Sequence, residues 1–464
     1  LRWQGTRPPS VDGSVRMLDI GCGDGIAIAL TAASCPDGQF CGIDGMPEHV
    51  ARGTAFAASH EIDNLELRCL TFEDALEAAD GLYDYIISQG VIAWVSAENR
   101  ARVLDLAASK LAPGGVFAVG YNAMPGWQDR LTMQRLLREL ADGTEGAPSQ
   151  RFHRSLEMLE AIEAAGAYAL PKNRLEELHD LQERLPADYF PHEYLNENWA
   201  PLWSSDVRNE MMSRGLTFCG QTNFGRLRED FCLKAAHRTA LENINNPLLR
   251  DSLIDLFCNT GFRVDMFVRE PAGGLKEDLI EEAWLSALCS VEEARFECRT
   301  AAGRLKFDNP AARHLLHALH GGPRRFGDIL AEATISTPDL VNAADALLTG
   351  RHIQPASPPR DVPSADDLNM AILYSAATGE GVQVEALVGS HGVVTCRLNE
   401  LLVAGMGNEA LIDRARTDPA FRERMFDTDA GLDDPETSAA IDRGRDAIKS
   451  RLARMGVRLP AALT

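Results

Sequence analysis

Residues 15–25 read VRMLDIGCGDG, and this stretch decides the fold of the chain. The apolar run at residues 15–20 is typical of a strand that is buried on both faces. It ends at three glycines, Gly21, Gly23 and Gly25, and an apolar helical stretch follows at residues 26–33. This order of strand, glycine-rich turn and helix opens the ligand site of a doubly wound α/β domain, because glycines let a ligand approach the backbone.

The spacing within the turn narrows the class of ligand. The pattern D-x-G-x-G-x-G from Asp19 to Gly25 differs from the G-x-G-x-x-G of dinucleotide sites. Asp24 lies inside the turn, where it would repel a pyrophosphate. A second short strand at residues 39–43 ends in Asp44, which is placed to bind ribose hydroxyls. These features favour a cofactor without phosphate and with cationic groups, and S-adenosylmethionine fits because it has ribose hydroxyls, a sulfonium and an ammonium.

Composition excludes several classes of partner and site. The 464-residue chain has 46 basic and 68 acidic side chains, and its net charge of −22 disfavours nucleic acid as a partner. The ten cysteines are scattered without a C-x-x-C pair, which argues against a zinc site and against a disulfide framework, and favours a reducing cytoplasm. No apolar run approaches the ~18 residues of a membrane span. The opening LRWQGTRPPS resembles no signal peptide and begins at Leu1, so we expect a cytoplasmic protein with residues preceding this chain.

Polar and aromatic residues follow the next strand, predicted at residues 65–70. Thr71 and Phe72 come directly after it, at the end where ligands of open α/β sheets lie. Phe72 is a candidate to cover an adenine face, and Glu73 or Asp74 to accept a hydrogen bond from its amino group. The alternative is a helix start that is simply enriched in acids.

Two further strands complete the predicted parallel sheet. Residues 84–88 form the fourth strand, a helix covers residues 97–111, and residues 116–120 form the fifth strand. This alternation of strand and helix predicts right-handed crossovers. We therefore expect an α/β fold with a Rossmann-like doubly wound sheet, a helical insertion and a mostly helical C-terminal domain.

The remaining pattern divides the chain into four regions. We predict a cofactor-binding core at residues 1–127, a helical insertion at 128–199, the remainder of the core at 200–272, and a C-terminal accessory domain at 273–464. Within the third region, residues 216–219 and 262–268 are expected to be the sixth and seventh strands of the same sheet. Three short helical patterns between residues 309 and 353 suggest a winged-helix-like arrangement.

Several motifs together resemble a known family. The stretch LDIGCGDG with Asp44, and LAPGG at residues 111–115, look like class I S-adenosylmethionine-dependent methyltransferases. The rarer YNAMPGW at residues 121–127 resembles methyltransferases with a methyltransferase regulatory domain, typified by rickettsial protein lysine methyltransferases that modify outer-membrane protein. SQGVIAWV, HEYL and DLFCNTGFR also look like that family. The resemblance covers about residues 5–270.

The resemblance implies roles for individual residues. The cofactor would be held by Asp19, Gly21, Gly23, Gly25, Asp44, Thr71, Phe72, Ser88 and Gln89. Ser88 and Gln89 would face the methyl group together with Trp94. The acceptor entrance would be lined by Tyr121, Asn122 and Trp127. Where family members are aligned with an acidic residue after the third strand, this chain has Thr71, so adenine contact shifts to Glu73 or Asp74.

The residue types also suggest how methyl transfer would proceed. An amine acceptor must arrive uncharged, and Trp94, Tyr121 and Trp127 would form an aromatic, water-poor channel that also attracts cations. Asn122 would orient the acceptor through its carbonyl oxygen, and Tyr121 would orient it or relay a proton. The alternative for Tyr121 and Trp127 is packing between the sheet and the helical insertion. For Glu193 and its neighbour His192, a structural loop contact is preferred over catalysis.

The sequence leaves the acceptor open. A methyltransferase acting on a protein lysine is the leading hypothesis, and a small-molecule N- or O-methyltransferase of secondary metabolism is the main alternative. A catalytically silent, methyltransferase-like interaction protein is disfavoured by the intact glycine turn and Asp44. A nicotinamide dehydrogenase is disfavoured by the glycine spacing and by Asp24.

Overall fold

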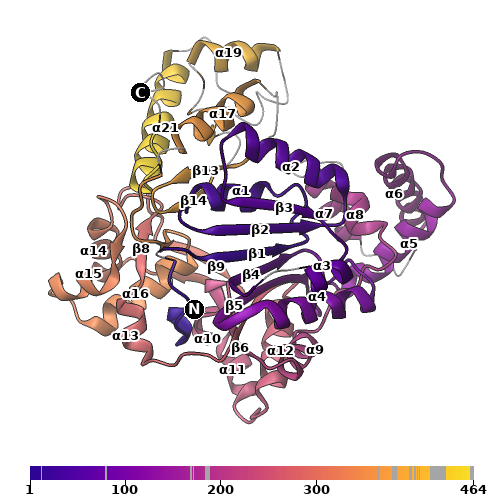
Figure 1. Cartoon of the computed structure of the whole chain (residues 1–464), viewed down its shortest axis with the longest axis horizontal. Coiled ribbons are helices and arrows are strands. Elements are labelled where there is room, and N and C mark those ends of the chain that lie inside the picture. Colours follow the sequence, from indigo (N-terminus) through magenta and orange to yellow (C-terminus); the bar gives the residue numbers. More distant parts are fainter. Residues whose placement is uncertain are drawn as a thin grey trace. The chain divides into compact units, whose positions relative to one another are not determined.

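Among the residues that it describes, the computed structural model contains one seven-stranded sheet and three small ones. The large sheet has the strand order β3-β2-β1-β4-β5-β7-β6, and the predicted α/β fold is confirmed (Figure 1). The structure describes residues 1–464 except 12, 79–80, 168–169, 171, 183–188, 363–364, 379–383, 397–399, 402–403, 405, 407, 418–434 and 460–464. By compactness the chain divides into two units. The first contains residues 1–70, 83–85 and 271–464, and the second contains residues 71–82 and 86–270.

The N-terminal part of the first unit alternates strand and helix as predicted. Its elements are η1 (Arg2–Gln4), β1 (Arg16–Ile20), α1 (Ile26–Ala33), β2 (Gln39–Asp44), α2 (Pro47–Ser59) and β3 (Leu65–Cys69). Strand β1 pairs in parallel with β2, and β2 pairs in parallel with β3. Parallel pairing requires a crossover between the strands, and α1 and α2 supply these crossovers.

The C-terminal part of the first unit is mostly helical. Its elements are α13 (Lys276–Glu281), β8 (Trp284–Ala287), β9 (Glu297–Thr300), β10 (Gly303–Lys306), α14 (Pro310–Ala318), β11 (Arg324–Arg325), α15 (Phe326–Glu332), α16 (Thr337–Thr349), β12 (Ile353–Ala356), α17 (Ala365–Thr378), β13 (Ala386–Gly389), β14 (Gly392–Thr395), α19 (Asn408–Thr417) and α21 (Pro435–Arg454). The three helical patterns expected before residue 353 are α14, α15 and α16. Strand β12 follows them and joins the small sheet β11-β8-β12.

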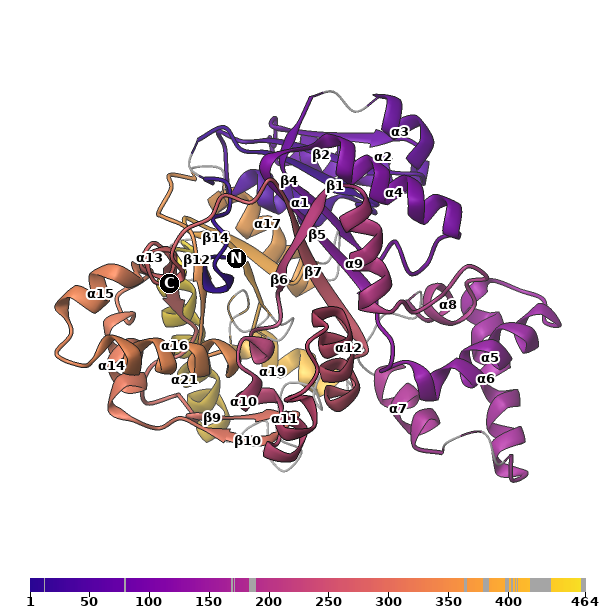
Figure 2. The ribbon, with the colours of Figure 1, turned by 90° about the horizontal axis from the view of Figure 1, so that it is seen from below.

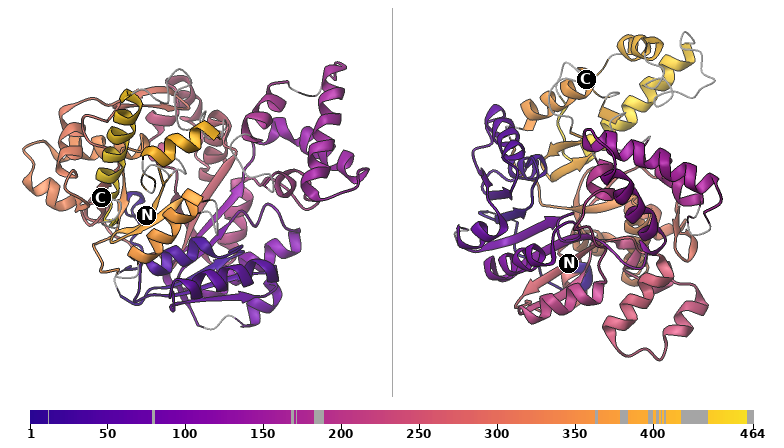
Figure 3. Two further views of the ribbon diagram at one scale, coloured as in Figure 1. Left: turned by 90° about the horizontal axis from the view of Figure 1, so that it is seen from above. Right: turned by 90° about the vertical axis from the view of Figure 1, so that its right-hand side faces the viewer.

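One hydrophobic core joins the two ends of the first unit. Ile28 and Leu30 of α1 belong to the same cluster of buried side chains as Leu368 and Ile372 of α17 and Leu452 of α21. These C-terminal helices are drawn in orange and yellow in Figure 3. The first helix of the chain is therefore buried by residues more than 300 positions away in the sequence.

The second unit holds the remaining strands of the large sheet and a group of helices. Its elements are α3 (Phe72–Ala78), β4 (Tyr83–Gln89), α4 (Ala97–Lys110), β5 (Leu111–Asn122), η2 (Gln128–Arg130), α5 (Leu131–Asp142), α6 (Pro148–Ala164), α7 (Lys172–Gln182), α8 (Tyr189–Tyr194), α9 (Ser204–Ser213), β6 (Leu216–Gln221), η3 (Phe224–Arg226), α10 (Glu229–Cys232), α11 (Ala235–Leu241), α12 (Pro247–Cys258) and β7 (Phe262–Arg269). The first three residues of β4 are grouped with the first unit.

The last two strands lie in the large sheet, as the sequence predicts. Strand β7 pairs antiparallel with both β5 and β6. The LAPGG stretch at residues 111–115 falls inside β5, but the pairing of β5 with β7 begins only at Val116. Helices α5–α8 form a group of their own beside these strands (Figure 2). Their core contains Leu137, Phe152, Leu159 and Phe190.

Gly53 of α2 tests how tightly the first unit is packed. A Cβ atom at this position would lie 2.0 Å from the carbonyl oxygen of Asp24 and 2.6 Å from Cδ1 of Leu67. In an exposed helix, replacing glycine by alanine stabilises by up to about 1 kcal/mol. Here we expect the opposite sign, because overpacking costs about 1–3 kcal/mol. Urea unfolding of Gly53→Ala measures the difference.

The neighbouring, exposed Arg52 provides the matched control. Arg52→Ala should leave the free energy of unfolding within about 0.5 kcal/mol of the parent value. A Gly53→Ala protein as stable as the parent would mean that the glycine is not required by close packing.

Candidate active site

Three glycines after β1 adopt a backbone conformation that other residues rarely adopt. The φ angles of Gly21, Gly23 and Gly25 are +75°, +59° and +69°. A Cβ atom at Gly25 would lie 2.8 Å from the Leu67 side chain, whereas one at Gly23 would meet nothing within 4 Å. Leu67 therefore packs against the turn at Gly25, whereas no protein atom covers the position that a side chain would take at Gly23. This open side is where a ligand can approach the backbone.

Asp44 connects the end of β2 to this turn. One carboxylate oxygen accepts a hydrogen bond from the amide of Gly23 at 3.0 Å, and the other accepts from the amide of Met46 at 2.9 Å. His49 Nδ1 lies 3.5 Å from the second oxygen. Asp24 accepts from the amide of Ile26 at 3.3 Å, so a carboxylate of the chain itself occupies the start of α1. A phosphate would have to displace that carboxylate.

The electrostatics of the turn favour a cation. Burial raises the pKa of Asp19 to about 7, and the neighbouring carboxylate of Asp44 contributes to the increase. Each of the two carboxylates makes ionisation of the other less favourable. A positive group placed near both stabilises their ionised forms. The open Gly23 and this acid pair both fit an S-adenosylmethionine molecule, which has hydroxyls and cationic groups but no phosphate.

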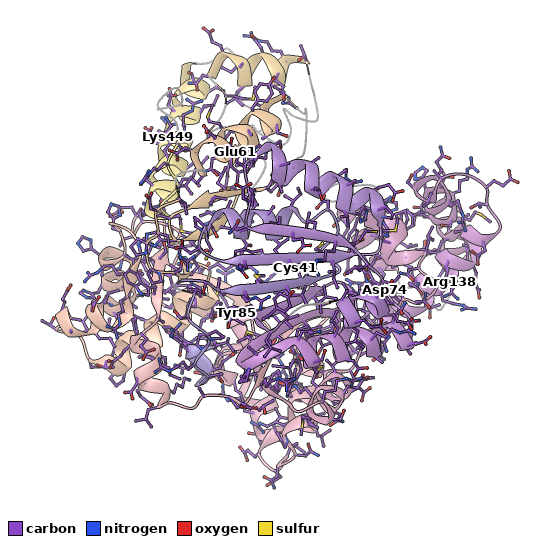
Figure 4. The ribbon with its side chains drawn as sticks, in the orientation of Figure 1. Cys41, Glu61, Asp74, Tyr85, Arg138 and Lys449 are labelled. Atoms are coloured by element: carbon purple, nitrogen blue, oxygen red, sulfur yellow. The ribbon has the colours of Figure 1, made fainter. Side chains whose placement is uncertain are left out.

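Thr71 directly precedes α3 in the second unit. Its hydroxyl accepts a hydrogen bond from the amide of Asp74 at 3.1 Å and donates to the Asp74 carboxylate at 2.8 Å. Asp74 lies on the first turn of α3 (Figure 4). Glu73 is exposed and pairs with Arg102 at 3.2 Å, and Phe72 is half-buried. Capping therefore engages Thr71 and Asp74, while the Phe72 ring is partly accessible.

The end of β4 carries the next two predicted residues. Ser88 is fully buried, whereas Gln89 is exposed. A Cβ atom at Gly120 of β5 would lie 2.3 Å from Oε1 of Gln89, so the absence of a side chain at Gly120 makes room for Gln89. The amide of Gly90 donates to the carbonyl of Gly120 at 3.1 Å. The Gln89 side chain is thereby positioned across the neighbouring strand.

Helix α8 and the segment after it cover the ends of β4 and β5. The Trp94 and His192 rings are parallel with centroids 6.3 Å apart. Asn196 donates to the carbonyl of Trp94 at 2.8 Å, and the amide of Ala200 donates to the carbonyl of Ala93 at 2.8 Å. His192 is exposed and Trp94 is half-buried, so this stacked pair is accessible from solvent.

Asn122 at the end of β5 is bound to a buried carboxylate. Its amide nitrogen donates to Oε1 of Glu193 at 2.5 Å, and the Trp199 indole donates to the same oxygen at 2.9 Å. Burial raises the pKa of Glu193, while hydrogen bonds from Trp199, Asn122 and Tyr189 oppose the increase. An ionised carboxylate only accepts hydrogen bonds, so it fixes the amide nitrogen of Asn122 towards itself and turns the carbonyl oxygen away.

Tyr121 enters a buried network of charged residues. Its hydroxyl donates to Asp265 at 2.7 Å, and the Arg263 Nε donates to the other Asp265 oxygen at 2.9 Å. Arg263 also pairs with Asp255, which in turn pairs with Arg226 at 3.0 Å. Burial, followed by the charge of Asp265, raises the pKa of Tyr121 well above its usual range. These partners lie on β7, α12 and η3 and not on the predicted helical insertion, so they do not match the packing alternative, and the catalytic role of Tyr121 stays a prediction.

Trp127 packs inside the helical group. Its indole donates to the carbonyl of Gly261 at 2.9 Å, and its ring contacts Trp199 with centroids 4.9 Å apart and Tyr194 at 6.3 Å. Gly126 is required beside it, because a Cβ atom there would lie 2.4 Å from the backbone of Thr260 and Gly261. The backbone of the Y-N-x-x-P-G-W motif thus packs directly against the segment 259–261.

Sequence reasoning did not anticipate two features of this site. It treated Glu193 as a loop contact, and it did not single out Arg263 or its acidic partners. A buried carboxylate could have been suspected only from the aromatic residues around HEYL. Arg263 and Asp265 alternate with apolar residues on β7. Charged residues at inward-facing positions of a strand were the available signal for a buried charged network.

Two negative findings concern the part of the chain that the structure describes. It contains no group of three or more histidine, cysteine or acidic side chains that could hold a metal ion. Among these same residues, no helix combines the length and apolar character required to cross a membrane.

Family models match both halves of the region described above. A model for a methyltransferase domain matches residues 12–173, and one for a predicted methyltransferase regulatory domain matches residues 186–269. The second match includes α8, the segment over β4 and β5, and the buried charged network.

Individual proteins are similar over different lengths. An uncharacterized protein of Synechocystis is 24% identical over 414 residues, which are 86% of this chain and 81% of that protein. Trans-aconitate 2-methyltransferase of Streptomyces avermitilis is 29% identical over 157 residues, which are 33% of this chain and 54% of that enzyme. PKMT2 from Rickettsia typhi, solved in complex with AdoHcy, superposes with a TM-score of 0.65 at 17% identity, covering 98% of this chain and 95% of that one. At this identity the structural likeness establishes the fold.

Removing Arg263 tests the buried network. Arg263→Met leaves Asp255 and Asp265 buried without their shared cation, and we expect a loss of about 3–5 kcal/mol of unfolding free energy. Urea unfolding measures it. Arg135→Met, which removes an exposed pair with Glu139, should cost no more than about 0.5 kcal/mol. Equal stability of the two variants would contradict a structural role for the network.

Proposed function

We propose that this S-adenosylmethionine-dependent methyltransferase transfers its methyl group to an amine, and that the acceptor is a lysine side chain of a protein. The observation that carries the proposal is the Asn122–Glu193 pair at the end of β5. Ligands of open α/β sheets bind beyond the carboxyl ends of the strands, where this pair lies. When bound, the cofactor supplies a methyl group on a positively charged sulfur.

Asn122 is proposed to orient the acceptor. Glu193 accepts from the amide nitrogen of Asn122, so the carbonyl oxygen points elsewhere and can accept an N–H of an uncharged amine. A hydrogen bond accepted at that oxygen would leave the amine lone pair directed away from Asn122 and free to react. Alignment of this kind supplies most of the catalysis when the leaving group is already activated.

Trp94 is proposed to receive the aliphatic chain and cationic end of the acceptor. An indole face attracts a cation by about 0.5–2 kcal/mol, and its apolar surface favours loss of charge from the amine. The exposed position of His192 beside Trp94 supports an acceptor that is carried by a protein rather than enclosed in a chamber. The resemblance to rickettsial protein lysine methyltransferases supports the same acceptor.

The cofactor-side residues keep the roles that the resemblance implies. We propose that Gly23 and its two neighbouring glycines approach the amino-acid part of the cofactor, that Asp19 faces its ammonium and that Asp44 binds its ribose. Phe72, Thr71, Ser88 and Gln89 are proposed to border the adenine and the methyl group. Trp127 is proposed to act through packing, since its indole nitrogen is engaged by Gly261.

Mass spectrometry tests the acceptor. The enzyme is incubated with a cofactor carrying an isotopically labelled methyl group, together with basic proteins in one arm and small amines or carboxylic acids in the other. Label on a protein lysine is expected, and Asn122→Ala should abolish it while S-adenosylhomocysteine still binds. Label in small molecules alone would favour the alternative related to trans-aconitate 2-methyltransferase. Failure to bind S-adenosylhomocysteine would identify a silent, methyltransferase-like protein.

Glu193→Gln tests the orientation of Asn122. A glutamine can present either its oxygen or its nitrogen, so Asn122 is no longer held in one orientation. We expect kcat to fall by about tenfold to a hundredfold with the cofactor Kd unchanged within about twofold. The acid limb of the kcat profile, which reports protonation of Glu193, should disappear. Glu197→Gln, on the exposed side of the same segment, is the matched control. An acid limb retained in Glu193→Gln would rule out this role.

Cofactor binding should also depend on pH through Asp19. Its pKa of about 7 means that the carboxylate is ionised above that pH and protonated below it. An ammonium favours the ionised form, so affinity for S-adenosylhomocysteine should fall by up to about tenfold per pH unit between about pH 7 and about pH 5. Calorimetry measures the slope. Asp19→Asn should remove it, and an unchanged slope in that variant would assign the effect to another group.

A further inference from the structure

Two cysteines meet at the ends of two helices in the second unit. Cys232 is the last residue of α10 and Cys258 is the last residue of α12. The Cys258 thiol donates to the carbonyl oxygen of Cys232 at 3.6 Å, and the Cys232 thiol donates to the carbonyl oxygen of Arg228 at 3.5 Å. Both are free thiols; Cys232 is buried and Cys258 is half-buried. One sulfur of the pair is therefore accessible and the other is shielded.

The surroundings make the two thiols unequal. Interaction with the neighbouring Cys232 thiol, together with the nearby Arg226 guanidinium, lowers the pKa of Cys258, although burial opposes this. Interaction with Cys258, together with burial, raises the pKa of Cys232. In six other cysteines burial raises the pKa, namely Cys22, Cys41, Cys219, Cys289, Cys298 and Cys396. A partly accessible thiolate beside a protonated thiol is the arrangement of an attacking and a resolving cysteine.

The residues after Cys258 hold the Y-N-x-x-P-G-W motif in place. The carbonyl of Thr260 accepts from the amide of Gly126 at 3.1 Å, and the carbonyl of Gly261 accepts from the amide of Ala123 at 2.9 Å. Arg226 also contacts the Thr260 hydroxyl at 3.3 Å. Any change at Cys258 therefore reaches the loop that follows Asn122 through one short, hydrogen-bonded segment, residues 259–261.

We propose that Cys232 and Cys258 form a reversible disulfide, and that its formation loosens the contact between residues 259–261 and the loop at residues 123–127. The oxidant is a hydroperoxide such as hydrogen peroxide. The Cys258 thiolate attacks one peroxide oxygen, which gives a sulfenic acid on Cys258 and releases hydroxide. The Cys232 sulfur then attacks the Cys258 sulfur, and the Cys232 proton and the sulfenic hydroxyl leave as water. Two thiols thus lose two electrons, and one peroxide becomes two water molecules.

The loosening follows from two consequences of that bond. Disulfide formation leaves Cys258 with no charge for the nearby Arg226 guanidinium to attract. It also fixes the end of α12 to the end of α10, because a disulfide holds the two Cβ atoms about 3.5–4.5 Å apart. Asn259 follows directly in the left-handed conformation, with φ +48°, and connects this constraint to Thr260 and Gly261.

Peptide mass spectrometry of the full chain tests the disulfide. The protein is titrated with hydrogen peroxide, blocked with an alkylating agent and digested without reductant. A cross-linked pair of peptides containing Cys232 and Cys258 is expected before the exposed Cys69 is modified, and dithiothreitol should reverse it. Cys232→Ser should stop the reaction at a sulfenic acid on Cys258, which dimedone traps. Cys69→Ser is the matched control and should leave the cross-link unchanged. Oxidation of Cys69 ahead of Cys258, or oxidised Cys258 without the cross-link, would overturn the proposal.

Hydrogen exchange tests the effect on the loop. In the oxidised protein the amides of Ala123 and Gly126 should exchange about tenfold faster than in the reduced protein, and reduction should restore the slow rate. Cys258→Ser should show no change on peroxide treatment. An unchanged exchange rate in a protein proven to carry the disulfide would refute the coupling. Both readouts are independent of methyl transfer, so they stand or fall separately from the proposed acceptor.

Discussion

The carboxylate of Asp44 holds together the part of the structure on which the rest depends. By accepting from the amides of Gly23 and Met46, it ties the end of β2 to the turn after β1. Leu67 packs against the left-handed glycines of that turn. The absence of a side chain at Gly53 lets α2 approach the turn closely. The turn is thus held by these contacts and is acidic, and an acidic turn favours a cationic ligand over a phosphate-bearing one.

Much of the secondary structure can be predicted from local sequence signals. The strands β1 and β2 are short apolar runs, and the glycines between β1 and α1 leave few alternatives to a tight turn. Helix α12 is likewise predicted by local signals, because Asn246 caps it, Pro247 begins it and Asn259 ends it. The prediction of seven strands in one sheet is confirmed for the same reason, since each strand is bounded by turn residues. Neither this regularity nor the glycine turn reveals the acceptor.

The partners of Tyr121 and Asn122 could not be predicted because they are distant in the sequence. Asn122 and Glu193 are 71 positions apart, and Tyr121 and Asp265 are 144 positions apart. From sequence alone, Tyr121 and Asn122 are adjacent polar residues with equal claims to catalysis. The structure separates them, because alternate residues of β5 face opposite sides of the sheet. Tyr121 joins the network around Arg263, and Asn122 meets the carboxylate carried by α8. The contact between Cys258 and Cys232 likewise joins residues that are distant in the sequence, and it distinguishes Cys258 from the other cysteines.

Calorimetric titration with S-adenosylhomocysteine tests the central claim, that the acidic glycine turn binds the cofactor through Asp44. Asp44→Asn keeps the size of the side chain but loses the charge that strengthens hydrogen bonds to ribose hydroxyls, and Glu48→Gln on the adjacent turn of α2 is the control. The account predicts at least a tenfold weaker Kd, about 1.4 kcal/mol, for folded Asp44→Asn, and an unchanged Kd for Glu48→Gln. Parent affinity in a folded Asp44→Asn protein would contradict it.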